Sequence, residues 1–265
     1  MTRILCLHGW RTNSAFLERQ MAQLKAKLGG AVEFSFMEGP ISGMLAADDD
    51  VEQECMPPYF QWWEPLDGLA GQRSAVQHVA DHIRAHGPFD ALLGFSEGAA
   101  CASAFVAALH AAGRGNAEAR QELKAELADV IPPRLVICVC GIPPDEFRPG
   151  CFCLGRGSSS KVQRQVPVAS IHVIGDSDSD RRGSEELAKE WYGATSQQAN
   201  AAAGVILRHP HGHRFPLDCR PLADAIREAI SKDIGPKANK TAAHTSVSVE
   251  HCTLPDPSRL AVAGC

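Results

Sequence analysis

The chain has 265 residues, 45% of them hydrophobic, which is enough for one sizeable core and requires no second domain. Its net charge of -5 and isoelectric point near 6.1 give no support for binding to nucleic acid or to an anionic membrane surface. Ten cysteines are present, but the first seven residues have the pattern of a strand and not of a signal peptide, so we expect a cytoplasmic protein with reduced thiols. No apolar run reaches the length of a membrane span.

Apolar runs typical of buried strands alternate with helical patterns along the first 231 residues. The runs predict strands at residues 3–7, 32–36, 91–93, 135–140, 170–174 and 204–208. Helical patterns cover residues 14–28, 74–86, 99–109, 116–130 and 217–231. This alternation predicts an α/β fold with a mostly parallel sheet covered on both faces, in a single domain of residues 1–231. Residues 232–265 lack periodicity, and we expect a disordered tail.

The segment Gly94-Phe95-Ser96-Glu97-Gly98 has the G-x-S-x-G pattern of a nucleophile elbow. It lies between the short apolar run 91–93 and the alanine-rich helical pattern 99–109, which is the strand-turn-helix setting that such an elbow needs. The glycines remove the Cβ atoms that would clash in so tight a turn. The pattern predicts that Ser96 is a nucleophile and that the backbone N–H of Glu97 faces a developing oxyanion.

The dipeptide His8-Gly9 directly follows the first predicted strand. An H-G dipeptide after an early strand is where a hydrolase of this kind places its second oxyanion donor, so the backbone N–H of Trp10 is the candidate. We interpret His8 as a structural, hydrogen-bonded residue and not as a base.

Acids and histidines alternate after the last two predicted strands. Aspartates follow the strand at 170–174 and histidines follow the strand at 204–208: Asp176, Asp178 and Asp180, and His209, His211 and His213. A serine nucleophile needs a general base and an acid that orients it, and both clusters lie at the expected strand ends. The alternatives are a solvated acidic loop and a metal site on the histidines. Pro210 and Gly212 disfavour the metal site because they break the strand that would align the rings.

Taken together, these segments resemble the FSH1 family of serine hydrolases. The resemblance extends over residues 1–231 and rests on residues 7–11, 60–63, 94–99, 172–178 and 209–216. It implies an α/β-hydrolase fold, with Ser96 as nucleophile, Asp178 as acid and His213 as base. Asp176 is the alternative acid.

Three positions depart from that family's pattern. Glu97 stands where the family usually has Gln, Thr12 where it tends to have Gln, and Ser179-Asp180-Arg181-Arg182 where an apolar residue and a Pro are usual. A carboxylate at Glu97 would oppose a neighbouring oxyanion unless its side chain points away.

Two segments are longer than simple connections require. Residues 37–70 contain four aromatic residues that we predict to form a substrate-binding wall or lid, with anchoring of the loop to the core as the alternative: Tyr59, Phe60, Trp62 and Trp63. Residues 141–167 contain three cations that suit a substrate anion or simple solvation, namely Arg156, Lys161 and Arg164. The C-x-C pairs at 138–140 and 151–153 lack the spacing typical of structural zinc.

We therefore expect a serine hydrolase that cleaves small-molecule carboxylic esters through an acyl-enzyme, without a metal or other cofactor and with medium or longer acyl chains preferred. A thioesterase that releases acyl chains from a carrier protein or coenzyme A is the enzymatic alternative. A hydrolase fold without activity that serves as an interaction module is the alternative from another class. The oligomeric state is left open by the sequence.

Overall fold

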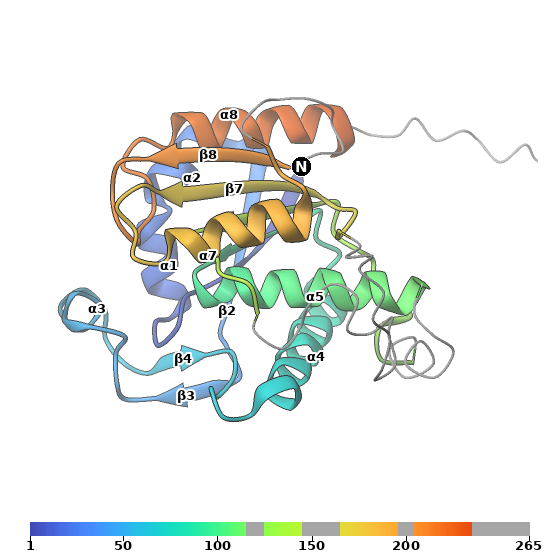
Figure 1. The fold of residues 1–265 in the computed structure, drawn as a ribbon, viewed down its shortest axis with the longest axis horizontal. Coiled ribbons are helices and arrows are strands. Elements are labelled where there is room, and N and C mark those ends of the chain that lie inside the picture. The colour runs from blue at the N-terminus through green and yellow to red at the C-terminus, as the bar shows by residue number, and fades with distance from the viewer. Residues whose placement is uncertain (115–124, 145–164, 196–203, 235–265) are drawn as a thin grey trace, which may run out of the picture. The chain divides into compact units, whose positions relative to one another are not determined.

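The computed structural model describes residues 1–114, 125–144, 165–195 and 204–234. A parallel sheet of six strands runs through these residues in the order β2-β1-β5-β6-β7-β8 (Figure 1). Its strands are β1 (Thr2–Leu7), β2 (Val32–Met37), β5 (Ala91–Phe95), β6 (Leu135–Val139), β7 (Ala169–Gly175) and β8 (Val205–His209). Each contains most or all of a predicted strand, and the mostly parallel α/β sheet expected from the sequence is confirmed.

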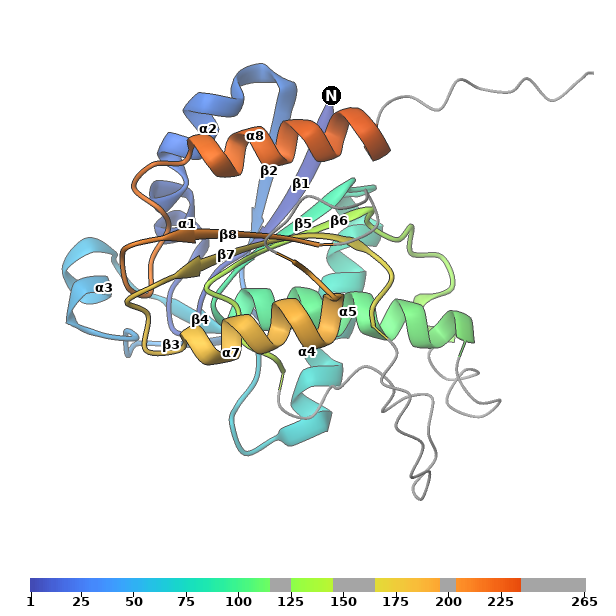
Figure 2. The ribbon, with the colours of Figure 1, turned by 45° about the horizontal axis from the view of Figure 1, so that its top comes forward.

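Helices cover both faces of the sheet, as Figure 2 shows. One face carries α1 (Ser14–Gln20), α2 (Ala22–Leu28) and α8 (Arg220–Ala229), and the other carries α4 (Gly68–His86), α5 (Glu97–Arg114) and α7 (Arg181–Glu186). The alternation of side chains along a strand produces two cores: Leu5 and Leu7 of β1 pack on the α4–α5 side, and Ile4 and Cys6 on the α8 side. Every side chain of the central strand β5 is buried.

Several elements differ from the predicted helices. The expected helix 14–28 is two helices joined at Met21, and α1 begins after Asn13, whose side chain accepts a hydrogen bond from the Phe16 N–H. A helical segment after β7, α7 continued by a π-helix over Leu187–Trp191, was not predicted. Short helices also follow at Gly29–Ala31 and Ile230–Ile234. Most of residues 116–130, the three loop cations, Cys151, Cys153 and the tail from 235 lie outside the described residues.

Residues 37–70 were expected to form a loop, but they have secondary structure of their own. The antiparallel hairpin of β3 (Ile41–Gly43) and β4 (Tyr59–Gln61) flanks the short helix α3 (Asp49–Glu54). Asp48 caps α3 by accepting a hydrogen bond from the Val51 N–H at 2.9 Å. Periodicity was hard to detect here because each element is so short.

The strand order places the functional segments together. The sheet grows in opposite directions from β1, with β2 on one side and β5 on the other, and the carboxyl ends of β1 and β5 flank this switch point. In open parallel sheets, ligands bind at that place. The loops after β1, β5, β7 and β8 therefore open onto the same edge.

Among the described residues, no helix is long and apolar enough to cross a membrane.

Candidate active site

Ser96 lies on a strained turn between β5 and α5. Its φ of 55° falls in the left-handed region, which residues with a Cβ rarely adopt. The flanking glycines make this turn possible: a Cβ at Gly94 would lie 2.4 Å from the backbone of Ala99, and a Cβ at Gly98 would lie 2.2 Å from the Leu7 carbonyl oxygen. The serine is thereby held at the carboxyl edge of the sheet, as the sequence predicted.

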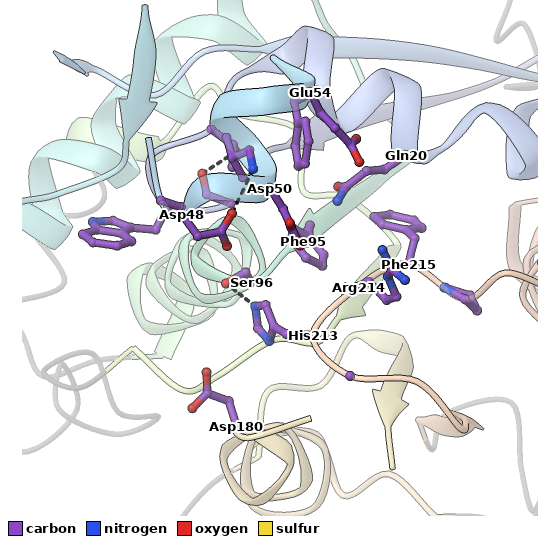
Figure 3. A pocket seen from close by; sticks show the side chains of 18 of the residues that line it. Gln20, Asp48, Asp50, Glu54, Phe95, Ser96, Asp180, His213, Arg214 and Phe215 are labelled. Atoms are coloured by element: carbon purple, nitrogen blue, oxygen red, sulfur yellow. Dashed lines mark hydrogen bonds between the residues drawn. The ribbon is translucent and has the colours of Figure 1, made fainter. Parts of the chain in front are cut away.

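His213 and Asp178 complete a continuous line of hydrogen bonds to Ser96. Nε2 of His213 lies 2.9 Å from the Ser96 hydroxyl, and its Nδ1 lies 3.0 and 3.1 Å from the two carboxylate oxygens of Asp178 (Figure 3 shows the Ser96–His213 pair). A carboxylate only accepts, so Nδ1 carries the proton and Nε2 is free to accept the serine proton. The Asp178 side chain is fully buried, whereas that of His213 is 31% exposed toward the cavity.

The side chains of Asp176, Asp180 and His209 are not part of this line of hydrogen bonds. Asp176 is about half exposed and pairs with Arg208 at 2.9 Å, away from the imidazole. Asp180 donates its backbone N–H to Asp178 at 2.8 Å, which helps to fix the buried carboxylate. His209 is buried at the end of β8, where burial lowers the pKa of its ring. Geometry therefore singles out Asp178 and His213 from the two alternating sets.

The thiol of Cys140 lies close to the Asp178 carboxylate and the His213 ring. Its sulfur atom and the ligand atoms of Asp178 and His213 all lie within 4.8 Å of one another, and within the described part of the chain this is the group that could hold a metal ion. Burial raises the pKa of the Cys140 thiol to about 12, and the Asp178 charge adds to the shift. A metal on Nδ1 would replace the bond between His213 and Asp178.

The loop after β1 passes beside the serine. A Cβ at Gly9 would lie 3.4 Å from the Ser96 Cβ, and Gly9 and Trp10 line the same cavity as Ser96. Arg11 has a φ of 48°, and the Thr12 N–H bonds back to the Gly9 carbonyl at 3.3 Å, which closes a tight turn. The Trp10 amide is thus carried on a tight turn at the cavity.

His8 is fully buried and held from both ring nitrogens. Nε2 accepts the Gly39 N–H at 3.0 Å, and Nδ1 donates to the Gly9 carbonyl oxygen at 2.8 Å. Burial lowers the pKa of His8, which favours the neutral ring, and the single ring proton is used in the bond to the Gly9 carbonyl oxygen. The structural interpretation of His8 agrees with these contacts.

Glu97 begins α5 with its carboxyl group turned toward the segment after β4. Its Oε2 accepts the backbone N–H of Trp62 at 3.1 Å. Burial raises the pKa of Glu97 to about 8, more than the Trp62 N–H lowers it, and the charge of Glu64 raises it further. The first intrahelical bonds run from Ala99 and Ala100 to the Ser96 carbonyl, so the Glu97 N–H at the helix start has no acceptor within the helix.

A cavity of about 700 Å³ opens over Ser96 and His213 (Figure 3). Its apolar lining comes from β5, α1, α3, the loop after β1 and the segment before α8: Trp10, Phe16, Val51, Phe95, Phe215, Pro216 and Leu217. Its charged lining comprises Asp48, Asp50, Glu54, Asp180 and Arg214. Phe16, Val51 and Leu217 were not predicted to line a cavity, because no local pattern distinguishes a cavity wall such as Phe16 from a helix face that packs in the core.

The four aromatic residues predicted as a substrate wall do not line this cavity. Trp62 is fully buried, and its indole N–H donates to the His8 carbonyl oxygen at 2.8 Å. Tyr59 is buried and donates its hydroxyl to the Cys55 carbonyl oxygen at 2.8 Å, and Phe60 donates its backbone N–H to the Thr12 carbonyl. Trp63 packs against the core on the α4 side. These contacts are those of a hairpin anchored beneath the loop after β1, which is the alternative that the sequence left open.

Comparison of the sequence with known proteins identifies a family and several relatives. A family profile described as "Serine hydrolase (FSH1)" matches residues 1–221. The protein named Esterase OVCA2 from Bos taurus is 30% identical over 237 residues, which cover 82% of this chain and 90% of the relative. The protein of the same name from Homo sapiens is 30% identical over 239 residues, or 81% and 89% of the two chains. Esterase FPY3 from Fusarium mangiferae is 26% identical over 247 residues, or 87% and 95%.

Solved structures resemble the fold at lower identity. Acyl-protein thioesterase 2 from Zea mays superimposes with a TM-score of 0.52 at 15% identity and covers 86% of this chain and 94% of its own. Esterase PE8 gives a TM-score of 0.50 at 16% identity, covering 86% and 92%. This likeness concerns the fold, which is that of the α/β-hydrolases.

Proposed function

The chain belongs to the FSH1 family of serine hydrolases, and on this premise we propose that it cleaves carboxylic esters through an acyl-enzyme formed on Ser96. The observation that carries the proposal is the continuous line of hydrogen bonds from Asp178 through His213 to Ser96, at the bottom of an open cavity.

Each residue of this line has a distinct role. Ser96 Oγ attacks the ester carbonyl while His213 Nε2 takes its proton, and the imidazolium that forms is stabilised by Asp178. The N–H groups of Trp10 and Glu97 hold the oxyanion. His213 then gives its proton to the leaving alkoxide, and the same base activates the water that hydrolyses the acyl-enzyme and restores Ser96.

The cavity lining supports a substrate with an apolar acyl group. Phe16, Phe215 and Leu217 offer apolar surface beside Ser96, where each buried methylene contributes about 0.8 kcal/mol. These three residues, and not Trp62 and Trp63, line the cavity over Ser96. On this basis we propose the preference for medium or longer acyl chains.

Charge in the cavity favours neutral esters over coenzyme A thioesters. Of the acidic lining residues, Asp48 caps α3 and Glu54 pairs with Arg19 at 3.3 Å, but the described residues show no ion pair for Asp50 or Asp180. Arg214 is the one lysine or arginine among the described lining residues. The negative phosphates of a coenzyme A thioester would be repelled by these carboxylates.

We expect kcat/KM for butyryl-coenzyme A to be at least about tenfold lower than kcat/KM for methyl thiobutyrate, a neutral thioester. Equal rates, or a preference for the coenzyme, would contradict this charge argument.

The test of the nucleophile is Ser96→Ala. We expect hydrolysis of p-nitrophenyl butyrate to fall on the order of 10⁴-fold or more, with labelling by a fluorophosphonate probe lost and the melting temperature retained. Retained turnover by a folded Ser96→Ala protein would overturn the assignment. A wild-type protein that neither hydrolyses the ester nor reacts with the probe would instead favour an interaction module without activity.

Six described cysteines are free thiols and buried, which suits the cytoplasmic location that we also propose.

A further inference from the structure

The carboxyl group of Glu97 connects the nucleophile elbow to the loop after β1. It accepts the Trp62 N–H at 3.1 Å, and the indole of the same tryptophan donates to the His8 carbonyl oxygen at 2.8 Å. Trp62 and His8 are both fully buried. The Glu97 side chain therefore connects the start of α5, through Trp62, to His8 at the beginning of the loop after β1.

Further hydrogen bonds of the loop after β1 come from the same hairpin region. The Phe60 N–H donates to the Thr12 carbonyl oxygen at 2.6 Å, and the Gly39 N–H donates to His8 at 3.0 Å. These bonds fix the loop to residues 39–62, and the bond between Glu97 and Trp62 fixes that region to the elbow. The two proposed oxyanion donors are the backbone N–H groups of Trp10 and Glu97. The bond between Glu97 and Trp62 therefore connects the elbow, which carries one donor, to the region that holds the loop carrying the other.

The surroundings of Glu97 disfavour a charge on it. Among the described residues, the titratable groups that face it are Glu64, after β4, and Cys101, one turn further along α5. Glu64 is exposed and acidic, and the Cys101 thiol is buried with its pKa raised well above the ordinary value. Neither supplies a positive charge. Burial raises the pKa of Glu97 to about 8, so the carboxyl is predominantly protonated at neutral pH.

We propose that Glu97 is a positioning residue that works in its protonated form, holding the elbow and the loop after β1 together, and that its ionisation at alkaline pH slows acylation. This rests on the proposed esterase function. A neutral carboxyl accepts the Trp62 N–H without opposing an oxyanion, whereas a carboxylate places a negative charge in the same residue whose backbone N–H stabilises that oxyanion.

The test is the dependence of kcat/KM on pH, from 6 to 10, for wild type and three variants. Glu97→Gln keeps an oxygen acceptor for Trp62 and removes the charge, Glu97→Ala removes both, and Glu64→Gln is the control on a nearby exposed acid. If the ionised form is inactive, wild-type kcat/KM falls about tenfold per pH unit above about pH 8. We expect this fall to persist in Glu64→Gln and to be absent in both Glu97 variants. Glu97→Ala should also lose about tenfold or more in kcat with little change in KM, and Glu97→Gln should restore much of that loss.

A second readout does not depend on activity. The folded protein keeps the Glu97 proton up to about pH 8, whereas the unfolded chain loses it near pH 4.5, so the folded state binds more protons between these values. Wild-type stability should therefore fall relative to Glu97→Gln as pH rises through this window, and the melting temperatures should diverge by several degrees.

The inference is overturned if Glu97→Gln retains the alkaline fall in kcat/KM, or if the difference in melting temperature does not change with pH. These results are distinct from failure of the proposed function. If Ser96→Ala retained full turnover while the melting temperatures still diverged, the esterase assignment would fail and the protonation of Glu97 would stand.

Discussion

The two aspartates at the end of β7 allow the same substitution to be compared at neighbouring positions. Asp178→Asn alters a fully buried carboxylate bonded to His213, and Asp176→Asn alters an exposed one paired with Arg208. Asn and Asp have nearly the same shape, so packing is preserved at both positions. Any difference in activity then reports hydrogen bonding and charge.

The expected magnitude follows from the contacts of Asp178. Its Oδ1 accepts the Asp180 N–H at 2.8 Å, so an asparagine would place its oxygen there and its NH₂ group at the position of Oδ2, 3.0 Å from Nδ1 of His213. A donor at that position favours the tautomer with the proton on Nε2, which can no longer accept the Ser96 proton. The known cost of the wrong tautomer in a serine protease triad is about 10⁴-fold in kcat. Asp176→Asn loses only an exposed ion pair, worth about 0.2–1 kcal/mol of stability, and should change kcat less than about twofold.

The assay is kcat for p-nitrophenyl butyrate with both variants, accompanied by the fluorophosphonate labelling rate and the melting temperature. We expect Asp178→Asn to lose activity and labelling together while remaining folded. The reasoning would be refuted by an Asp178→Asn protein within about tenfold of wild type, or by an equal loss in Asp176→Asn.

Two further predictions concern the cavity and the elbow. Leu217→Ala removes apolar cavity lining and should lower the ratio of kcat/KM for p-nitrophenyl octanoate to that for p-nitrophenyl acetate by about fivefold. The control is Leu66→Ala, at an exposed leucine outside the lining, which should leave that ratio unchanged. A Leu217→Ala protein with the wild-type ratio would show that acyl chains bind elsewhere. Gly98→Ala forces a Cβ to within 2.2 Å of the Leu7 carbonyl oxygen and should lower the free energy of unfolding by about 3 kcal/mol or more. Gly30→Ala places a Cβ that meets nothing within 4 Å and should change that free energy by less than about 1 kcal/mol. Equal melting temperatures for the two variants would refute the packing argument.

Features that depend on neighbouring residues were predictable from the sequence. The elbow at Ser96 was evident because a G-x-S-x-G turn between strand and helix is specified within about ten residues by glycine sterics and apolar patterning. The central strands β5, β6 and β7 were predicted because a strand buried on both faces is apolar almost throughout. The α3 segment and the helical stretch after β7 were not predicted, because each is too short or too polar for a periodic apolar face to stand out.

Features that depend on distant segments were decided by the tertiary structure. Asp178 and His213 are 35 residues apart, and Ser96 and His213 are 117 apart, so no local pattern could select them from two alternating sets without the family resemblance. The aromatic residues after β3 had equal reason to line a cavity or to anchor a hairpin, and contacts such as the hydrogen bond from Trp62 to the His8 carbonyl, which favour the anchor, form only when distant segments meet. The state of Glu97 likewise depends on what surrounds it: its identity was plain in the sequence, but only the burial produced by folding raises its pKa, because desolvation is a property of the assembled interior and not of the chain.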